Sequence, residues 1–279
     1  MEKLGLVAGA GTLPVEVARE CLEAGRPLYI VRLKSLAEAS LAEYPSGEAG
    51  LTEFGRIFRL LKDAGCHTVC MAGIVNRPDF RTLVPDLKGL SLLPSLLTAA
   101  RKGDDALLRA VVVAFEKEGF KVEGAQDVAG SLTLGAGPLG RHAPRPEDQE
   151  DIERALHVAR AIGGMDIGQG AVVVHGLVLA VEAQEGTDAM LRRVTQLPEA
   201  IRGTPASPRG VLAKAPKPIQ ERRVDLPTIG LATVHRVAAA GLSGIAGEAG
   251  GVIVLDRDAV IAEADSLGLF IIGVEASGA

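Results

Sequence analysis

Residues 214–230 gather the side chains of this chain that best suit phosphate chemistry. The segment holds four cations, two carboxylates and three prolines between apolar stretches. The prolines exclude a continuous helix and favour extended backbone in the residues before them. Every third side chain of a polyproline-like run lies on one edge. That edge would carry Lys214, Lys217, Gln220 and Arg223. This row of donors, followed by the carboxylate of Asp225, predicts phosphate chemistry assisted by a divalent metal.

An exposed connector is the alternative interpretation of this segment, because charged, proline-rich stretches often link folded parts. Two observations favour a functional site. The flanking residues 211–213 and 228–240 are largely apolar and typical of a core, so both ends should be anchored. Proline also lowers the entropy that a loop loses on ordering, which suits a pre-organised site.

A glycine-containing loop, Gly9-Ala-Gly-Thr-Leu-Pro14, follows the first apolar run of the chain. Glycines at such a place let backbone N–H groups approach a phosphate at the start of a helix. The candidate binding residues are Gly9, Gly11, Thr12 and Leu13. The second strand-like run ends near Arg32, where an NAD site would need an acid. This favours a nucleotide diphosphate without nicotinamide and leaves an NADP site as the alternative.

Carboxylates also follow the apolar run 177–181, just before an expected helix at 188–196. Ligands of α/β sheets bind beyond the carboxyl ends of strands, so Glu185 and Asp188 could supply oxygen ligands to Mg²⁺. The alternative makes Thr187 a helix cap and Asp188 a charge that complements the helix dipole. The residues alone leave both interpretations open.

Other polar residues stand at similar places. Asn76 and Arg77 follow the expected strand 68–73, again at the edge where ligands bind. Asp104 suits the cap of a helix at 104–118, and Asp105 beside it is a candidate ligand contact. Asp166 lies in a glycine-rich segment and is either a turn residue or a site acid.

The composition disfavours several classes of function. A net charge near −5 and an aromatic content of 3% argue against a nucleic-acid surface. Three cysteines and a start unlike a signal peptide predict reduced, buried thiols in a cytoplasmic protein. The histidines form no metal motif, and His175 is expected in the core. No apolar run is long enough to span a bilayer, so any membrane contact would be peripheral.

Strand-like and helix-like runs alternate along the chain, which predicts an α/β fold with a parallel sheet in the first half. Residues 126–146 are rich in Gly, Pro and Ser. We therefore expect domains at 1–125 and 147–279, both α/β, with 126–146 as a linker. Leucines crowd residues 87–97. A core helix is the default interpretation of this segment, and an acyl-chain groove is the alternative.

Taken together, the motifs resemble those of the UDP-2,3-diacylglucosamine pyrophosphatase family of lipid A biosynthesis, the type unrelated to calcineurin-like phosphoesterases. The resemblance covers nearly the whole chain. The chain departs from the family pattern at one position: residue 221 is Glu, where the family commonly has Asp. The motifs that carry it are Ala8–Pro14, Ala72–Pro78, Gly103–Asp105, Glu185–Asp188, Lys217–Gln220, Arg223–Pro227 and Ala264–Ser266.

The resemblance implies an N-terminal Rossmann-like domain, a C-terminal α/β catalytic domain and a homodimer. It also implies Mg²⁺-dependent hydrolysis of UDP-2,3-diacylglucosamine to UMP and 2,3-diacylglucosamine 1-phosphate (lipid X). The substrate is expected between the domains. The enzyme would meet its lipid at the cytoplasmic face of the inner membrane.

The expected mechanism is attack of a water molecule on one phosphorus of the pyrophosphate. Asp225 would bind Mg²⁺ or orient the water, with Glu185 and Asp188 as further metal ligands. Three cations would offset charge on the phosphoryl oxygens; these are Lys214, Lys217 and Arg223. The expected substrate contacts are Gly9, Gly11, Thr12, Leu13, Asn76, Arg77, Asp105 and Gln220. An NADP-dependent oxidoreductase and a non-enzymatic lipid or nucleotide sensor are the alternative functions.

Overall fold

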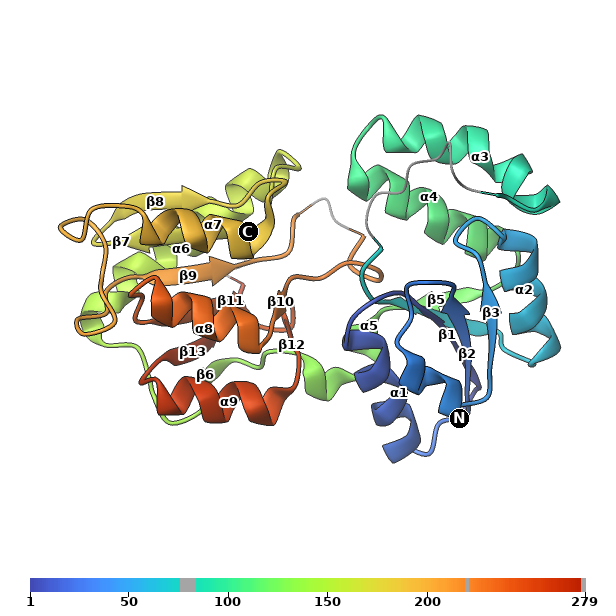
Figure 1. Ribbon diagram of the computed structural model, residues 1–279, viewed down its shortest axis with the longest axis horizontal. Coiled ribbons are helices and arrows are strands. Elements are labelled where there is room, and N and C mark those ends of the chain that lie inside the picture. Colours follow the sequence, from blue (N-terminus) through green and yellow to red (C-terminus); the bar gives the residue numbers. More distant parts are fainter. Residues whose placement is uncertain (76–83, 219–220, 277–279) are drawn as a thin grey trace. The chain divides into compact units, whose positions relative to one another are not determined.

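The computed structural model describes residues 1–75, 84–218 and 221–276, and the chain divides into two compact units. The first unit comprises Met1–Gly130 and Glu221–Asp225, and the second comprises Ser131–Gln220 and Leu226–Ala279. Each unit contains its own large sheet (Figure 1). The two-part α/β fold class expected from the sequence is confirmed.

The sheet of the first unit has five parallel strands in the order β3-β2-β1-β4-β5. The strands are β1 (Leu4–Ala8), β2 (Leu28–Leu33), β3 (Ser46–Ala49), β4 (Thr68–Ala72) and β5 (Lys121–Glu123). All five residues of β1 are buried, as expected for the central strand of a parallel sheet. This order is the Rossmann-type order, in which ligands bind beyond the carboxyl ends of the strands.

Helices cover both faces of this first sheet. They are α1 (Leu13–Glu23), the 3-10 helix η1 (Ala39–Glu43), α2 (Phe54–Asp63), α3 (Leu87–Ala100), α4 (Asp104–Lys117) and α5 (Ala125–Val128). In Figure 1, α1 and α5 lie on one face, and α2 and α4 lie on the other. Phe54, Phe58, Phe115 and Phe120 pack together under α2 and α4. Through Phe115, this aromatic cluster packs α4 against α2.

The sheet of the second unit has six strands in the order β6-β13-β11-β9-β7-β8. Its strands are β6 (Gly137–Leu139), β7 (Gly170–Val174), β8 (Leu177–Val181), β9 (Val211–Lys214), β11 (Gly244–Glu248) and β13 (Phe270–Val274). Strands β9, β11 and β13 are parallel, and the flanking strands run antiparallel to their neighbours. A separate parallel pair joins β10 (Thr228–Ile229) to β12 (Ile253–Val254).

Two apolar cores hold the helices of the second unit against this sheet. Its helices are η2 (Gly130–Leu132, which starts at the last residue of the first unit), η3 (Pro146–Asp148), α6 (Gln149–Gly164), α7 (Gly186–Thr195), α8 (Leu231–Ala239) and α9 (Arg257–Ser266). Buried residues of α7, α8 and α9 form one core, and those of α6 form the other. Among all the helices of the described residues, none has the length and apolar character needed to cross a membrane.

The extended ribbon expected at 214–230 is wrong. Lys214 is the last residue of β9, whereas residues 221–225 form a helical turn in which the Val224 and Asp225 N–H groups donate to the Glu221 carbonyl. Lys214 and Lys217 belong to the second unit and Arg223 to the first, so one continuous extended segment does not carry all three cations. Val224 packs against the apolar core of the first unit, and none of the residues 221–224 precedes a proline, so the prolines leave this turn unrestricted.

The structure also corrects the expectation for His175 and one of the two interpretations left open for Thr187. His175 is exposed rather than buried, because it occupies the tight turn between β7 and β8 with a φ of 48°. Gly176 beside it also has a positive φ, the pattern of a two-residue hairpin turn. Thr187 does not cap α7, whose N-cap residue is Glu185. The three cysteines are buried and free, as expected.

Candidate functional site

The loop after β1 is shaped by close packing against the chain that follows β4. The Gly9 and Ala10 N–H groups donate to the carbonyls of Ala72 and Ile74 at 2.8 and 3.0 Å. A Cβ atom on Gly9 would lie 2.9 Å from the Ile74 carbonyl oxygen, so a larger residue does not fit there. Gly11 has a φ of +86°, which disfavours other residues. The two glycines are therefore required by the fold itself, whatever the loop binds.

The start of α1 offers backbone donors at the carboxyl edge of the first sheet. Helix α1 begins at Leu13, and its N-cap residue Thr12 makes no side-chain cap. Across the described residues, the N–H groups of Gly11, Thr12 and Leu13 donate to no other residue. Unused N–H groups at a helix N-terminus attract anions because the helix dipole adds to their partial charge. This edge is therefore suited to a phosphate.

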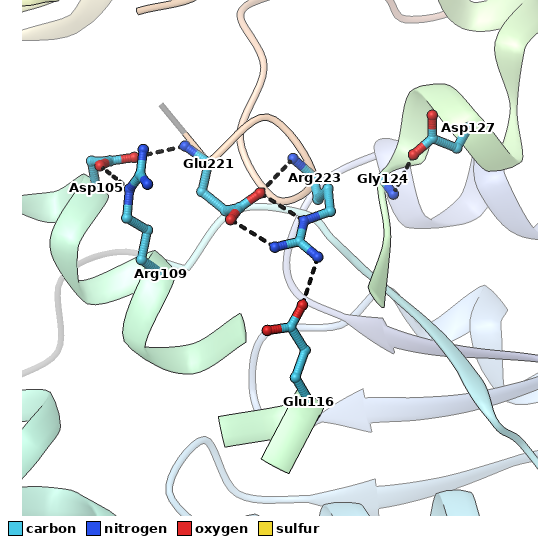
Figure 2. A network of polar contacts seen from close by, with 7 residues as sticks. All are labelled: Asp105, Arg109, Glu116, Gly124, Asp127, Glu221 and Arg223. Atoms are coloured by element: carbon cyan, nitrogen blue, oxygen red, sulfur yellow. Dashed lines mark hydrogen bonds and ion pairs between the residues drawn. The ribbon is translucent and has the colours of Figure 1, made fainter. Parts of the chain in front are cut away.

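Residues 221–225 form the turn that contains Asp225. Glu221 and Arg223 attach this turn to helix α4 (Figure 2). The Asp105 carboxylate, in the first turn of α4, accepts the Glu221 N–H at 2.7 Å. Glu116, in the last turn, accepts from Arg223 at 2.8 Å. Glu116 lies eleven positions after Asp105, a rise of about 16 Å along the helix. Both ends of α4 thus fix one short segment that is distant in sequence.

Within the turn, Arg223 and Glu221 form a two-pronged ion pair. The Arg223 Nε and Nη2 atoms donate to the two Glu221 oxygens at 2.8 and 2.9 Å (Figure 2). Hydrogen bonds from Arg223 lower the pKa of the Glu221 carboxyl. The Glu221 carboxylate, and then that of Glu116, raises the pKa of the Arg223 guanidinium. Two carboxylates therefore balance the charge of Arg223, and Asp225 follows in a half-buried position.

Lys214 is a buried lysine at the carboxyl end of β9, with 4% of its surface exposed. Its Nζ donates to the Thr187 hydroxyl and to the Thr228 carbonyl, both at 2.9 Å. The Thr187 hydroxyl in turn donates to Glu182 Oε1 at 2.9 Å. A buried ammonium needs such partners, because removing a charge from water is costly. The second unit thus places a fixed cation at the edge of its own sheet.

Lys217 and Asp166 form a second ion pair in the same unit, with Nζ 2.7 Å from Oδ1. Asp166 has a φ of 57°, so it is a turn residue. Its carboxylate also contacts Lys217, which was predicted as a site residue. Lys217 lies over α6, where a Cβ on Gly163 would come within 3.1 Å of the Lys217 Cα. The glycine permits this close approach.

The acids expected to bind metal with Asp225 are paired with arginines. Glu185 accepts from Arg193 at 2.5 Å, and Asp188 lies 2.9 Å from Arg236. Backbone hydrogen bonding at Glu185, and then Arg193, lowers the pKa of the Glu185 carboxyl. No group of three or more His, Cys, Asp or Glu side chains in the described parts of the chain could hold a metal ion.

Four further residues were predicted to contact the substrate, and the structure describes one of them, Asp105. Asn76, Arg77 and Gln220 lie outside the described residues. Asp105 contacts the Asp225 turn and also pairs with Arg109 at 2.7 Å. Arg32, which an NADP site could use, instead pairs with Glu48 at 3.0 Å and bonds to Ser46. Its charge is already engaged at the edge of the sheet.

Sequence reasoning missed Glu116, and it considered Glu182 only as one of the carboxylates that follow the apolar run 177–181. Glu182 directly follows an apolar strand, so its position at a strand end was a usable signal. Glu116 gave no signal, because its partner Arg223 lies 107 residues away. Its role depends on tertiary packing alone.

The fold and these contacts define a class: a two-part α/β protein with charged groups at the carboxyl ends of its parallel strands. Family models for the LpxI N-terminal domain and the LpxI C-terminal domain match residues 3–132 and 135–272. The chain therefore belongs to the LpxI family, which confirms the resemblance inferred from its motifs.

A curated relative from Caulobacter vibrioides is 64% identical over 275 residues, covering 99% of this chain and 98% of the relative. It is named UDP-2,3-diacylglucosamine pyrophosphatase LpxI. Among solved structures, the NAD⁺ complex of the Bordetella bronchiseptica enzyme WbmH gives a TM-score of 0.26 at 15% identity. That match covers 41% of this chain and 36% of the other.

Proposed function

We propose that this protein hydrolyses the pyrophosphate of UDP-2,3-diacylglucosamine to UMP and 2,3-diacylglucosamine 1-phosphate in lipid A synthesis. The observation that carries the proposal is the 64% identity, over nearly the full length of both chains, to the relative of that name. The buried Lys214 and the anchored Asp225 turn support it, since cations and a fixed carboxylate suit phosphoanhydride hydrolysis.

In the proposed reaction, water forms a P–O bond to one phosphorus while the bridging P–O bond breaks. The bridging oxygen leaves with its electron pair on the other phosphorus, and the water protons pass to solvent, so the products are two phosphate monoesters. Lys214 and Lys217 would offset charge on the phosphoryl oxygens. The N–H groups at the start of α1 would bind a phosphate or ribose oxygen. Arg223 would act mainly by holding the Asp225 turn, because its own charge is balanced by Glu221 and Glu116.

Mg²⁺ is the metal that we propose for this reaction, with Asp225 as the residue that would hold it. Mg²⁺ commonly binds through one or two carboxylates, with waters and substrate phosphates completing its shell. A single carboxylate fits this donor chemistry. Glu185 and Asp188, the other carboxylates considered, each pair with an arginine. When bound, the ion would supply charge neutralisation at the phosphate oxygens.

The first test is product analysis with purified protein and UDP-2,3-diacylglucosamine, with Mg²⁺ and with EDTA. The proposal expects UMP and lipid X in equal amounts, and only when metal is present. Turnover that persists in EDTA would refute the metal requirement. Substrate that stays bound and intact would refute hydrolysis and favour a sensor.

Asp225→Asn provides the matching residue test. The substitution keeps the size of the side chain and removes its charge, so turnover should fall at least about a hundredfold. The control is Asp63→Asn, which changes an exposed aspartate of the same unit and should leave turnover unchanged. Normal turnover by Asp225→Asn would exclude the role that we assign to this carboxylate.

A homodimer and peripheral contact with the inner membrane at its cytoplasmic face are also proposed, on the basis of the lipid substrate and the family resemblance. Light scattering after size-exclusion chromatography tests the first, and a mass of one chain would exclude it. Flotation with anionic vesicles tests the second. Protein that stays at the bottom of the gradient would exclude stable contact.

A further inference from the structure

A buried carboxylate, Glu182, lies in a small space that two glycines leave open. Only 7% of Glu182 is exposed. A Cβ on Gly170 would lie 2.6 Å from its Oε2 atom, and a Cβ on Gly168 would lie 2.1 Å from its carbonyl oxygen. In the described parts of the chain, Oε2 is buried without a hydrogen-bond partner. Leaving a buried carboxylate in this state is costly unless its charge serves a nearby group.

That nearby group is the ammonium of Lys214, reached through one hydroxyl. The Thr187 hydroxyl has a single proton, and it donates that proton to Glu182 Oε1. Its oxygen therefore faces Lys214 Nζ as an acceptor, at 2.9 Å. The order of donors is thus fixed along Lys214, Thr187 and Glu182. A cation, a hydroxyl and a carboxylate from three different segments form one directed chain.

A second buried carboxylate, Glu248, lies at the end of β11 and has a partner of its own. Glu248, at the end of β11, pairs with Arg160 of α6 at 3.0 Å. Glu248 is therefore paired with Arg160, whereas Glu182 is linked to Lys214 through Thr187. Among the described residues, the Thr187 hydroxyl bonds only to Glu182 and Lys214.

We propose that Thr187 and Glu182 are positioning residues that hold the Lys214 ammonium in place for the phosphoanhydride reaction. Lys214 contacts the substrate, and the other two residues act through it. The catalytic part of this inference rests on the proposed function. The positioning of Lys214 by Thr187 and Glu182 does not rest on the proposed function. An experiment can therefore reject the positioning and the proposed function separately.

The test compares Thr187→Val, Thr187→Ser and Glu182→Gln. Valine keeps the shape of threonine and lacks the hydroxyl, whereas serine restores the hydroxyl. The matched control is Thr195→Val on the same helix, because the Thr195 hydroxyl bonds only to the Arg192 carbonyl among the described residues. Each variant is first checked for a folded circular dichroism spectrum and a cooperative melting transition.

Two readouts are then taken. The first is kcat and KM for UDP-2,3-diacylglucosamine. The second is the rate at which an acylating reagent modifies Lys214, measured by peptide mass spectrometry. The exposed Lys121, whose side chain is 71% accessible, serves as the internal reference. The second readout needs no enzymatic activity.

We expect Thr187→Val and Glu182→Gln to lower kcat by about tenfold or more with a smaller change in KM, because a misplaced cation is lost chiefly at the transition state. Lys214 should also be modified faster relative to Lys121 in both. Thr187→Ser should stay near the wild type in both readouts, as should Thr195→Val.

Unchanged labelling of Lys214 in Thr187→Val would overturn the proposal, as would a loss in Thr187→Ser as large as in Thr187→Val. If the wild type shows no hydrolysis, the proposed function fails and the labelling rates alone decide the positioning of Lys214. Normal kcat in Thr187→Val, with faster labelling, would reject the catalytic part.

Discussion

Lys214 and Arg223 stand nine positions apart in the sequence, yet the structure gives them different chemical surroundings. Arg223 binds two carboxylates and remains 34% exposed. Lys214 is buried, and a hydroxyl links it to the Glu182 carboxylate. Both residues are cations, so their charge alone could not show that Arg223 holds the Asp225 turn whereas Lys214 is suited to bind a phosphate.

Glu116→Gln tests whether Arg223 holds the Asp225 turn. We expect turnover to fall by about three- to tenfold, because the turn loses one of its two anchors on α4. Stability should change by less than about 1 kcal/mol, since both partners are more than a third exposed and solvent screens the pair. Enzyme kinetics and urea unfolding measure the two effects.

The control for this substitution is Glu43→Gln, at an exposed site of the same unit. Equal turnover in wild type and Glu116→Gln would mean that Asp105 and the packing of Val224 suffice to hold the turn.

The Glu221 carboxyl gives a prediction for the dependence of stability on pH. Arg223 lowers its pKa in the folded state, so the group stabilises the fold above its unfolded pKa of about 4.3 and loses this contribution as the pH falls through the lowered value. The stability difference between wild type and Glu221→Gln should be constant above about pH 5.5 and shrink in acid below the unfolded pKa.

Urea unfolding at a series of pH values measures that difference. A difference that grows on acidification would contradict the assignment, because it would require a raised pKa for Glu221.

At the scale of elements, local patterns predicted the regular parts of the fold well. Apolar runs such as 68–72 and 211–213 became buried strands, and the Gly9–Pro14 loop leads into α1 as expected. The segment after Lys214 could not be predicted in this way. Its conformation is set by the Asp105 carboxylate and by the apolar core under α4, which are distant in sequence.

Gly9→Ala tests the close contact between the first loop and the chain after β4. The added Cβ would meet a backbone carbonyl at 2.9 Å. Backbone cannot move aside as a flexible side chain can, so we expect a loss of about 1–3 kcal/mol in the free energy of unfolding. Gly164→Ala is the control, because its Cβ would meet nothing within 4 Å. Equal stability of the two variants would show that the loops can separate at little cost.

At the scale of the whole molecule, the function was predictable because several short motifs occurred together in order along the chain, and the family match confirms that resemblance. The contacts of the site were not predictable. Arg223 and Glu116 are 107 residues apart, and Lys214 and Thr187 are 27 apart. Such pairs form only when separate elements pack, so a single sequence contains no local sign of them.

The short return of the chain into the first unit has a consequence for how this family can evolve. The N-terminal family model ends at residue 132 and the C-terminal model starts at residue 135. Glu221–Asp225 lie within the C-terminal model but belong to the first structural unit. Recombination between two genes at the boundary of the models would inherit Asp105 and Glu116 from one parent and their partners from the other. Chimeras should therefore lose activity where the parents differ at these positions, and regain it when residues 221–225 are exchanged together with the first half.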